Sequence, residues 1–234
     1  MWSRFTYNWK LCGDEMIDRE DITLIKNILS IDNKDIDTTL LYNVLSATKD
    51  FSDIEKDLFD SFSKNQLISK NKVLSMINNL NILNNNSEVI IFGSWYGSVL
   101  IPGLANKVKR ITCIDLDEKV LKIAKNRLFK DYSNVEYIPA DVFEKDRERY
   151  WHADLFINTS CEHMPSMKQW PYWPSTTHFV FTSNNMYSIE GHINCVDNIE
   201  QFKEQLPNNS TVLEEDEIMD ARGFRFFLAG RIDS

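Results

Sequence analysis

The chain is poor in the features that mark secreted, disulfide-rich or zinc-ribbon proteins. Its 234 residues include 4 cysteines, Cys12, Cys113, Cys161 and Cys195, and no two of them form a Cys-x-x-Cys pair. Neither a disulfide framework nor a zinc ribbon is therefore expected. The N-terminus has no long apolar run, so we predict neither a signal peptide nor a membrane span, and a reducing cytoplasm is the simplest compartment.

Positive charge is also scarce in this sequence. Lys and Arg number 26 against 35 Asp and Glu, which gives a formal net charge of -9. Nucleic acids and anionic membranes are bound through fields of Lys and Arg, so neither is an expected partner. Hydrophobic residues make up 43% of the chain, enough for a full core. A small molecule or a protein side chain is the expected partner, and the sequence carries no signal for the oligomeric state.

The first 86 residues contain no alternating strand pattern. Apolar residues three or four positions apart predict helices at Asp21–Leu29, Thr38–Leu45, Asp53–Phe62 and Ser69–Leu80. Ser69 is the expected N-cap of the last of these helices. We interpret residues 1–86 as a helical cap and residues 87–234 as a second domain.

From Glu88 onward, strands and helices alternate. Strands are predicted at Val89–Phe92, Ile111–Asp115, Val135–Ile138, Ala153–Asn158 and His178–Ser183, with helices near Ser98–Val108, after Asp117 and at Val196–Leu206. Two final strands, Thr211–Met219 and Phe224–Ile232, have a hairpin turn between them. This order predicts an α/β fold of three layers, a Rossmann-like sandwich around a mostly parallel seven-stranded sheet whose last strand is antiparallel.

The segment Ser87–Arg127 carries the strongest functional signal. A strand leads into a turn with Gly93 and Gly97, and the next strand ends in Asp115, 22 positions after Gly93. Nucleotide cofactors are bound by this order, because glycines let the cofactor approach the backbone and the acid accepts from both ribose hydroxyls. A tight turn and an acid that simply ends a strand explain the same residues without a ligand.

Four segments resemble the motifs of class I S-adenosylmethionine-dependent methyltransferases. They are IIFGSWYG at Ile90–Gly97, CIDLD at Cys113–Asp117, YIPADVF at Tyr137–Phe143 and DLFINTSCEHM at Asp154–Met164. The resemblance covers roughly Glu88–Ile232, and the run NTSCEHM is similar to a subset of uncharacterised methyltransferase-like proteins. The chain departs from the family pattern at Ile91, where an acid is usual, and at Trp95, the position of the middle glycine.

The resemblance implies S-adenosylmethionine as the cofactor. It assigns Asp115 to the ribose, Leu116 to the face of the adenine and Asp141 to the adenine amine. The full set that it implies for the cofactor is Phe92, Gly93, Ser94, Trp95, Gly97, Asp115, Leu116, Asp141, Val142 and Asn158. Asp141 is explained equally by an N-cap on the short turn that follows it.

Catalytic candidates follow the fourth predicted strand, where open α/β sheets bind ligands. They are Asn158, Glu162 and His163, of which the last two are suited to act as a general base or to orient a nucleophile. A hydrogen-bonded loop that holds the strand end is the competing interpretation. Cys161 fits a buried small hydrophobe better than a nucleophile. A metal site formed by His163, Glu162 and another ligand is an alternative, but no ligand spacing supports it, so none is predicted.

Substrate contacts are predicted for residues of three later loops: Ser160, Trp170, Tyr172, Asn184 and Tyr187. Trp170 and Tyr172 lie in a Pro-punctuated loop that is suited to stack on a cationic or planar substrate. Packing on the core explains these aromatics equally well, and turn formation explains Asn184. Arg222 and Arg225 either bind an acidic group of the acceptor or are solvated.

The expected activity is in-line transfer of a methyl group to a small molecule or a protein side chain. An NAD-dependent oxidoreductase shares the glycine turn and the acid, although this chain lacks the third glycine and ends in a hairpin. A non-catalytic cofactor-binding or scaffold protein is a further hypothesis, because a fold does not fix a function. Aminobutyryl transfer or cleavage of the cofactor in the same fold also stays open.

Overall fold

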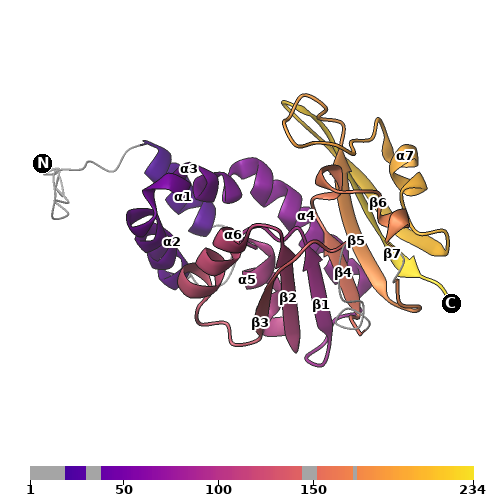
Figure 1. The fold of residues 1–234 in the computed structure, drawn as a ribbon, viewed down its shortest axis with the longest axis horizontal. Coiled ribbons are helices and arrows are strands. Elements are labelled where there is room, and N and C mark those ends of the chain that lie inside the picture. Colours follow the sequence, from indigo (N-terminus) through magenta and orange to yellow (C-terminus); the bar gives the residue numbers. More distant parts are fainter. Residues whose placement is uncertain (1–18, 30–37, 144–151, 171–172) are drawn as a thin grey trace, which may run out of the picture.

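The computed structural model describes residues 19–29, 38–143, 152–170 and 173–234. Its seven strands are β1 (Glu88–Phe92), β2 (Arg110–Asp115), β3 (Val135–Pro139), β4 (Leu155–Asn158), β5 (His178–Asn184), β6 (Ser210–Asp220) and β7 (Gly223–Ile232). They form one sheet in the order β3-β2-β1-β4-β5-β7-β6 (Figure 1). Strands β1 to β5 pair in parallel, whereas β7 runs antiparallel to both β5 and β6. The predicted fold class is confirmed.

The helical elements are α1 (Arg19–Leu29), α2 (Thr38–Asp50), η1 (Ser52–Ile54), α3 (Glu55–Ser61), α4 (Lys64–Leu80), α5 (Leu100–Leu104), η2 (Ala105–Lys107), α6 (Glu118–Ile123), the π-helical turn η3 (Ala124–Leu128), η5 (Cys161–His163), η6 (Met167–Gln169) and α7 (Ile199–Glu204). Among the helices that the structure describes, none combines the length and apolar composition of a bilayer span. The last helix is shorter than predicted and begins after Asn198, whose side chain caps it.

Two apolar clusters, one on each face of the sheet, create the three layers. Val89 and Ile91 of β1 point to one face, where Leu58 and Met76 of the N-terminal helices belong to the same buried cluster. The alternate residues Ile90 and Phe92 point to the other face and join the cluster of η6, β5 and α7. This alternation follows from the pleat of a strand that is covered on both sides.

The N-terminal helices form a continuous layer with the helices of the sheet. Leu24 of α1 and Val44 of α2 lie in the same buried cluster as Leu121 of α6. Figure 1 shows α1, α2 and α3 beside α6, while α4 runs across toward β5, and α4 also contacts β7 and α5. The division of the chain at residue 86 into a cap and a domain stays a prediction.

The predicted N-cap at Ser69 is wrong, because α4 begins five residues earlier. Its N-cap is Ser63, whose hydroxyl accepts the N–H of Gln66 over 3.5 Å. Ser69 is buried inside the helix. The sequence Ser-x-x-Gln before an apolar run matches a capping box, and that signal locates the start better than the hydrophobic period does.

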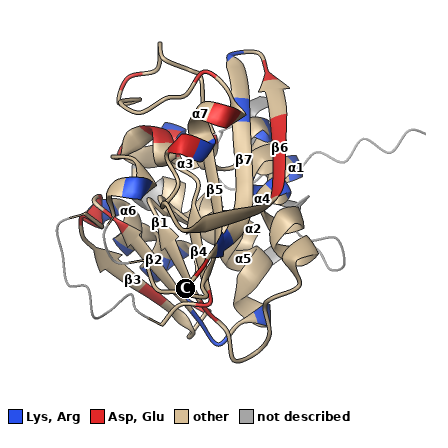
Figure 2. Cartoon of the chain, turned by 90° about the vertical axis from the view of Figure 1, so that its right-hand side faces the viewer, with Lys and Arg blue, Asp and Glu red and all other residues tan. Residues whose placement is uncertain are grey.

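An acidic edge closes the sheet at β6. Glu214, Glu215, Asp216 and Glu217 follow one another along this strand, which Figure 2 shows in red. Lys72 of α4 pairs with Glu214 over 3.6 Å and with Asp216 over 2.5 Å. Charged side chains on an edge strand oppose pairing with another chain, so this edge ends the sheet.

Candidate functional site

A cavity of about 670 Å³ opens at the carboxyl ends of the parallel strands. Gly93 follows β1, Asp115 ends β2, Asp141 follows β3 and Ser160 follows β4, and all of them line it. Glu162 and His163 of η5 line the same cavity. Residues predicted for the cofactor and residues predicted for the acceptor thus face one space, although not all of them do, at the position where open α/β sheets bind ligands.

The glycine turn after β1 adopts left-handed backbone conformations. Gly93 has φ +55° and Gly97 has φ +68°. A Cβ on Gly93 would lie 3.1 Å from the Cβ of Ser160, and one on Gly97 would lie 2.4 Å from Cδ1 of Ile101. The chain therefore approaches the loop after β4 too closely for a larger residue at Gly93. Trp95 also has a positive φ, of 49°, which is unfavourable for an aromatic residue.

Asp115 is held by the backbone on both sides of its carboxylate. Trp95 donates its N–H to Oδ2 over 2.7 Å, and Asp117 donates its N–H to Oδ1 over 3.0 Å. Each carboxylate oxygen has a second lone pair, so each can accept one more hydrogen bond from a ligand. The half-buried side chain is fixed in place and lines the cavity.

The indole of Trp95 connects the glycine turn to the N-terminal helices. Its Nε1 donates to Oδ2 of Asp57 in α3 over 3.2 Å. Asp53, in the η1 turn, forms an ion pair with Lys119 of α6. These two contacts join the N-terminal helices to the elements that carry the predicted cofactor residues.

Glu162 is the most buried acid of the cavity, with 4% of its surface exposed. Its Oε1 accepts from Nδ2 of Asn184 over 2.6 Å and lies 3.8 Å from Nη1 of Arg225. Its Oε2 has no hydrogen-bond partner among the residues that the structure describes. A buried carboxylate with one unsatisfied oxygen is costly unless a ligand completes it.

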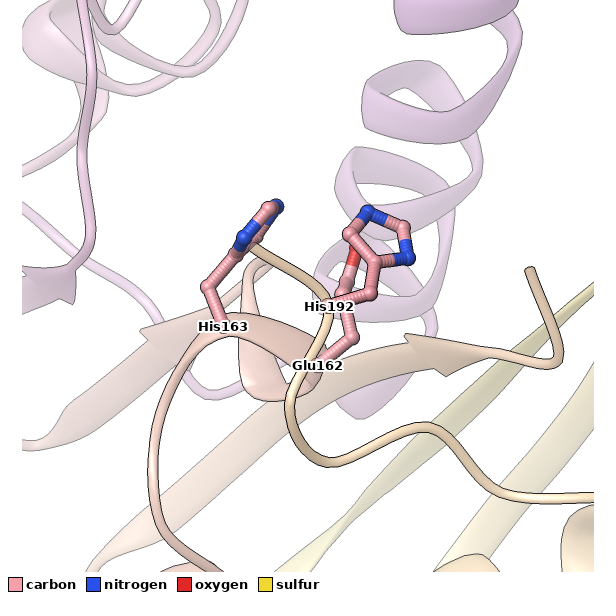
Figure 3. Close-up of side chains that lie close together, drawn as sticks. All are labelled: Glu162, His163 and His192. Carbon is pink, nitrogen blue, oxygen red and sulfur yellow. The ribbon is translucent and has the colours of Figure 1, made fainter. Parts of the chain in front are cut away.

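Two imidazoles lie next to Glu162. The rings of His163 and His192 are perpendicular, with centroids 4.6 Å apart, and Figure 3 shows both beside the carboxylate. Nδ1 of His163 lies 3.1 Å from the carbonyl oxygen of Gly191. Burial lowers the pKa of His192, and the nearby charge of Glu162 acts in the opposite direction.

Lys70 of α4 faces the same cavity. Lys70 is partly exposed, and protein atoms surround the rest of its side chain. Burial, reinforced by the positive charge of Arg225, lowers the pKa of Lys70 to about 7, while Glu162 acts in the opposite direction. A lysine in this range is a proton acceptor at neutral pH.

Solved structures of methyltransferases have a similar fold. The N-methyltransferase NodS from Bradyrhizobium japonicum is 15% identical, with a TM-score of 0.56 over 71% of this chain and 97% of that chain. A methyltransferase from Clostridium acetobutylicum is 12% identical, with a TM-score of 0.56 over 80% of this chain and 99% of that chain. The chain has the methyltransferase fold. No protein-family model and no curated protein sequence matches it.

Within this methyltransferase fold, most of the predicted cofactor residues line the cavity. Ser94, Trp95, Leu116, Asp141 and Val142 join the two glycines and Asp115 there. Leu116 is 74% exposed, an unusual position for a leucine outside a binding surface. Oδ1 of Asp141 accepts the N–H of Phe143 over 2.8 Å. This hydrogen bond is the one expected if Asp141 caps the short turn that follows it.

Two predicted cofactor residues, Phe92 and Asn158, are not among the residues that line the cavity. Phe92 is buried, with its ring centroid 5.3 Å from that of Trp170. Asn158 is 0% exposed, and its Nδ2 lies 3.0 Å from the sulfur of Met164. Its Oδ1 accepts the N–H of Ser160 over 2.9 Å. Asn158 therefore holds the loop after β4, as the competing interpretation expected.

Trp170 is a core residue, and its predicted stacking on a substrate is wrong. It is 1% exposed, and its Nε1 donates to the carbonyl oxygen of Val142 over 2.9 Å. Apolar packing accounts for its position because the surrounding rings of Phe92, Phe156 and Trp173 leave no open face. Tyr172 lies outside the described residues.

Two further substrate residues lie away from the cavity wall. Asn184 is buried and reaches the cavity only through its hydrogen bond to Glu162. Tyr187 is 57% exposed and donates its hydroxyl to Oδ1 of Asp197 over 2.7 Å.

Ser160 does line the cavity, and its Oγ donates to the carbonyl of Gly93 over 3.3 Å. Cys161 is buried, and burial raises its thiol pKa well above the ordinary value, which disfavours the thiolate form.

The sequence predicts that the N-terminal helices cover the site, but it did not identify which residues of α3 and α4 line the cavity. Asp60, Ser61, Gln66 and Lys70 line it from these helices. One signal was present in the sequence, because Lys70 lies three residues after Leu67 and three before Val73, both of which are buried. A charged residue inside an apolar helix stripe indicates a cavity or a partner for that charge.

Proposed function

We propose that the chain is an S-adenosylmethionine-dependent methyltransferase that acts on a small molecule or on a protein side chain. One observation carries the proposal: Asp115, fixed by the N–H of Trp95, lines the same cavity as Glu162 and His163. The NodS structure that was solved with S-adenosyl-L-homocysteine supports the cofactor class, at 17% identity and a TM-score of 0.55 over 71% of this chain and 88% of that chain.

The cofactor end of the cavity fits an adenosyl group. The free lone pairs of Asp115 accept from the two ribose hydroxyls. Gly93 and Gly97 both line the cavity, and their left-handed backbone conformations shape the turn that faces the ligand. Asp141 accepts from the adenine amine through the oxygen that does not bond Phe143. Leu116 covers the adenine face, which accounts for an exposed leucine at this position.

The acceptor end is formed by Glu162, His163, His192 and Lys70. S-adenosylmethionine supplies an activated methyl group, so the task of the protein is to place a nucleophile in line at about 3–3.5 Å and to take its proton. Lys70, whose pKa is about 7, is the group that can take this proton near neutral pH. Asn184 and Arg225 hold Glu162 in place.

The N-terminal helices form the wall opposite the sheet. Ser61 and Ser98 share a hydrogen bond of 2.7 Å between their hydroxyls, and both line the cavity. Trp95 adds its bond to Asp57 on the same side. A wall fixed at these two points limits the access of water to the reacting groups. A cavity of about 670 Å³ is within the usual size of small-molecule sites.

Calorimetric titration of the purified chain tests the proposed class of activity. S-adenosylmethionine and S-adenosyl-L-homocysteine should each bind at one site, whereas NAD should give no saturable heat. Binding of NAD without either sulfur cofactor would favour the dehydrogenase interpretation and overturn the proposal. Cofactor binding without methyl transfer across a broad acceptor screen would favour the scaffold interpretation. Mass spectrometry of the products separates methyl transfer from aminobutyryl transfer and from cofactor cleavage.

A further inference from the structure

We propose that Glu162, His163 and His192 bind a divalent transition-metal ion at the acceptor end of the cavity. One ligand atom from each of the three residues lies within 4.8 Å of the other two. Figure 3 shows the carboxylate and the two imidazoles gathered at one place, although they come from η5 and from the loop after β5. All three residues line the cavity that also contains Asp115.

The spacing of the ligand atoms requires a small closure around an ion. Nitrogen and oxygen ligands lie about 2.0–2.2 Å from a tetrahedral zinc ion, which places them roughly 3.4 Å from one another. His163 is exposed and is the side chain that would move by this amount, whereas Glu162 is buried and held by Asn184. The rigid acid therefore sets the position of the site, and the exposed imidazole closes on it.

The unsatisfied oxygen of Glu162 points to a cation independently of the spacing. Oε1 is occupied by Asn184 and lies nearer to Arg225, whereas Oε2 is buried and has no partner in the described part of the chain. At 3.8 Å, the contact between Arg225 and Oε1 is longer than a direct charge-assisted hydrogen bond of about 2.7–2.9 Å. Arg225 therefore pairs with Oε1 without a direct hydrogen bond, and Oε2 is the oxygen that a metal ion would bind.

The hydrogen bond of His163 fixes the tautomer that a metal requires. The carbonyl oxygen of Gly191 can only accept, so Nδ1 of His163, 3.1 Å away, carries the proton and Nε2 keeps its lone pair. Gly191 has φ +81°, a conformation in which glycine is favoured. Metal-bound histidines typically donate their other ring N–H to a carbonyl or a carboxylate in this way. Asn184 orients the carboxylate of Glu162 in the same manner.

The ligand set selects the class of ion. Two imidazoles and one carboxylate suit zinc, cobalt and iron, whereas magnesium and calcium prefer oxygen ligands. Three protein ligands leave a fourth position open toward the cavity. We assign the fourth ligand position to a hydroxyl or thiol of the acceptor, an assignment that rests on the proposed function. A metal ion at this site acts as a Lewis acid and lowers the pKa of the bound hydroxyl or thiol. The O–H or S–H bond then breaks. Its electron pair stays on the acceptor atom, and the proton passes to water.

The test measures metal binding without reference to activity. The full chain is treated with a chelator, dialysed and titrated with Co²⁺, followed by its visible absorption, and with Zn²⁺, followed by elemental analysis. We expect one equivalent of either ion per chain. Removal of one ligand in His163→Ala or His192→Ala should weaken the affinity at least about tenfold, and Glu162→Gln should do the same. The exposed His152, replaced in His152→Ala, is the matched control and should leave the affinity unchanged.

Two results would overturn the metal site: the absence of saturable binding by both ions, and equal affinity in wild type, His163→Ala and His192→Ala. Thermal unfolding of each metal-free variant shows that lost binding does not reflect lost folding. Titration of the metal-free chain with S-adenosyl-L-homocysteine separates the two proposals. Cofactor binding without metal binding refutes only the metal site, and metal binding without cofactor binding refutes the proposed function.

Discussion

The backbone N–H of Trp95 donates to Oδ2 of Asp115 over 2.7 Å, so the residue at the centre of the glycine turn holds the acid at the end of β2. Trp95 occupies the position of the family's middle glycine and still adopts a positive φ of 49°. Its indole reaches Asp57 at the same time. Trp95 therefore adopts a backbone conformation that glycine favours and adds a contact to the N-terminal helices.

Asp115→Ala should weaken the binding of S-adenosyl-L-homocysteine at least about tenfold, which corresponds to about 1.4 kcal/mol. The reason is the loss of the oxygens that accept from the ribose hydroxyls. Asp115→Asn should weaken it less, because its amide keeps one acceptor oxygen. Isothermal titration calorimetry measures both. Asp131→Ala removes an exposed aspartate outside the cavity and is the matched control. Equal affinities for Asp115→Ala and Asp131→Ala would refute the role of Asp115.

Gly97→Ala should destabilise the fold by roughly 2–5 kcal/mol. Its φ of +68° strains any L-residue, and the new Cβ would lie 2.4 Å from Cδ1 of the buried Ile101. Gly191→Ala carries the same kind of strain at φ +81°, but its nearest contact is 3.5 Å away, so about 1–2 kcal/mol is expected. Urea unfolding measures both variants. A cost for Gly97→Ala no larger than that for Gly191→Ala would show that Ile101 does not constrain the turn.

Lys70→Met should stabilise the chain most below about pH 7. The folded pKa of Lys70, about 7, lies below the value of about 10.4 for a free lysine. The unfolded chain therefore binds more protons between these values, and the wild type gains stability as the pH rises through this window. The advantage of Lys70→Met should shrink between about pH 7 and pH 10 in denaturant unfolding. Lys107→Met, at an exposed lysine, is the control. An advantage that is constant over this range would contradict the buried charge.

Trp170→Phe should destabilise the fold by about 1–3 kcal/mol, because it leaves the buried carbonyl of Val142 without its donor. A ring that stacks on a substrate would instead tolerate the change in the free protein. Denaturant unfolding of the variant distinguishes the two roles. A loss below about 0.5 kcal/mol would be typical of a surface position and would argue against the core role.

The parallel strands and the glycine turn could be predicted because their signals are local. Val89–Phe92 and Ile111–Asp115 are short apolar runs, and Asp115 lies at the predicted strand end. The hairpin strands also follow from the sequence, since Gly223 and its neighbours form a turn between two strand patterns. These features fix the position of the cavity because the carboxyl ends of parallel strands share one edge of a sheet.

Contacts between distant loops could not be predicted. His163 and His192 meet because the loop after β5 returns to η5, where the N–H of Ile193 donates to the carbonyl of Glu162 over 2.9 Å. No period in the sequence encodes this return. Trp170 was misplaced for a related reason, because an aromatic residue beside prolines is equally compatible with a surface loop and with a core. Its burial depends on the rings that surround it.

A crystal structure of the chain with S-adenosyl-L-homocysteine tests the central claim most directly. The account predicts that the adenosyl group lies in the cavity of about 670 Å³, with both ribose hydroxyls within hydrogen-bond distance of the carboxylate of Asp115 and the sulfur facing Glu162 and His163. A ribose bound elsewhere, or a carboxylate of Asp115 that contacts only the backbone while the ligand is present, would contradict it.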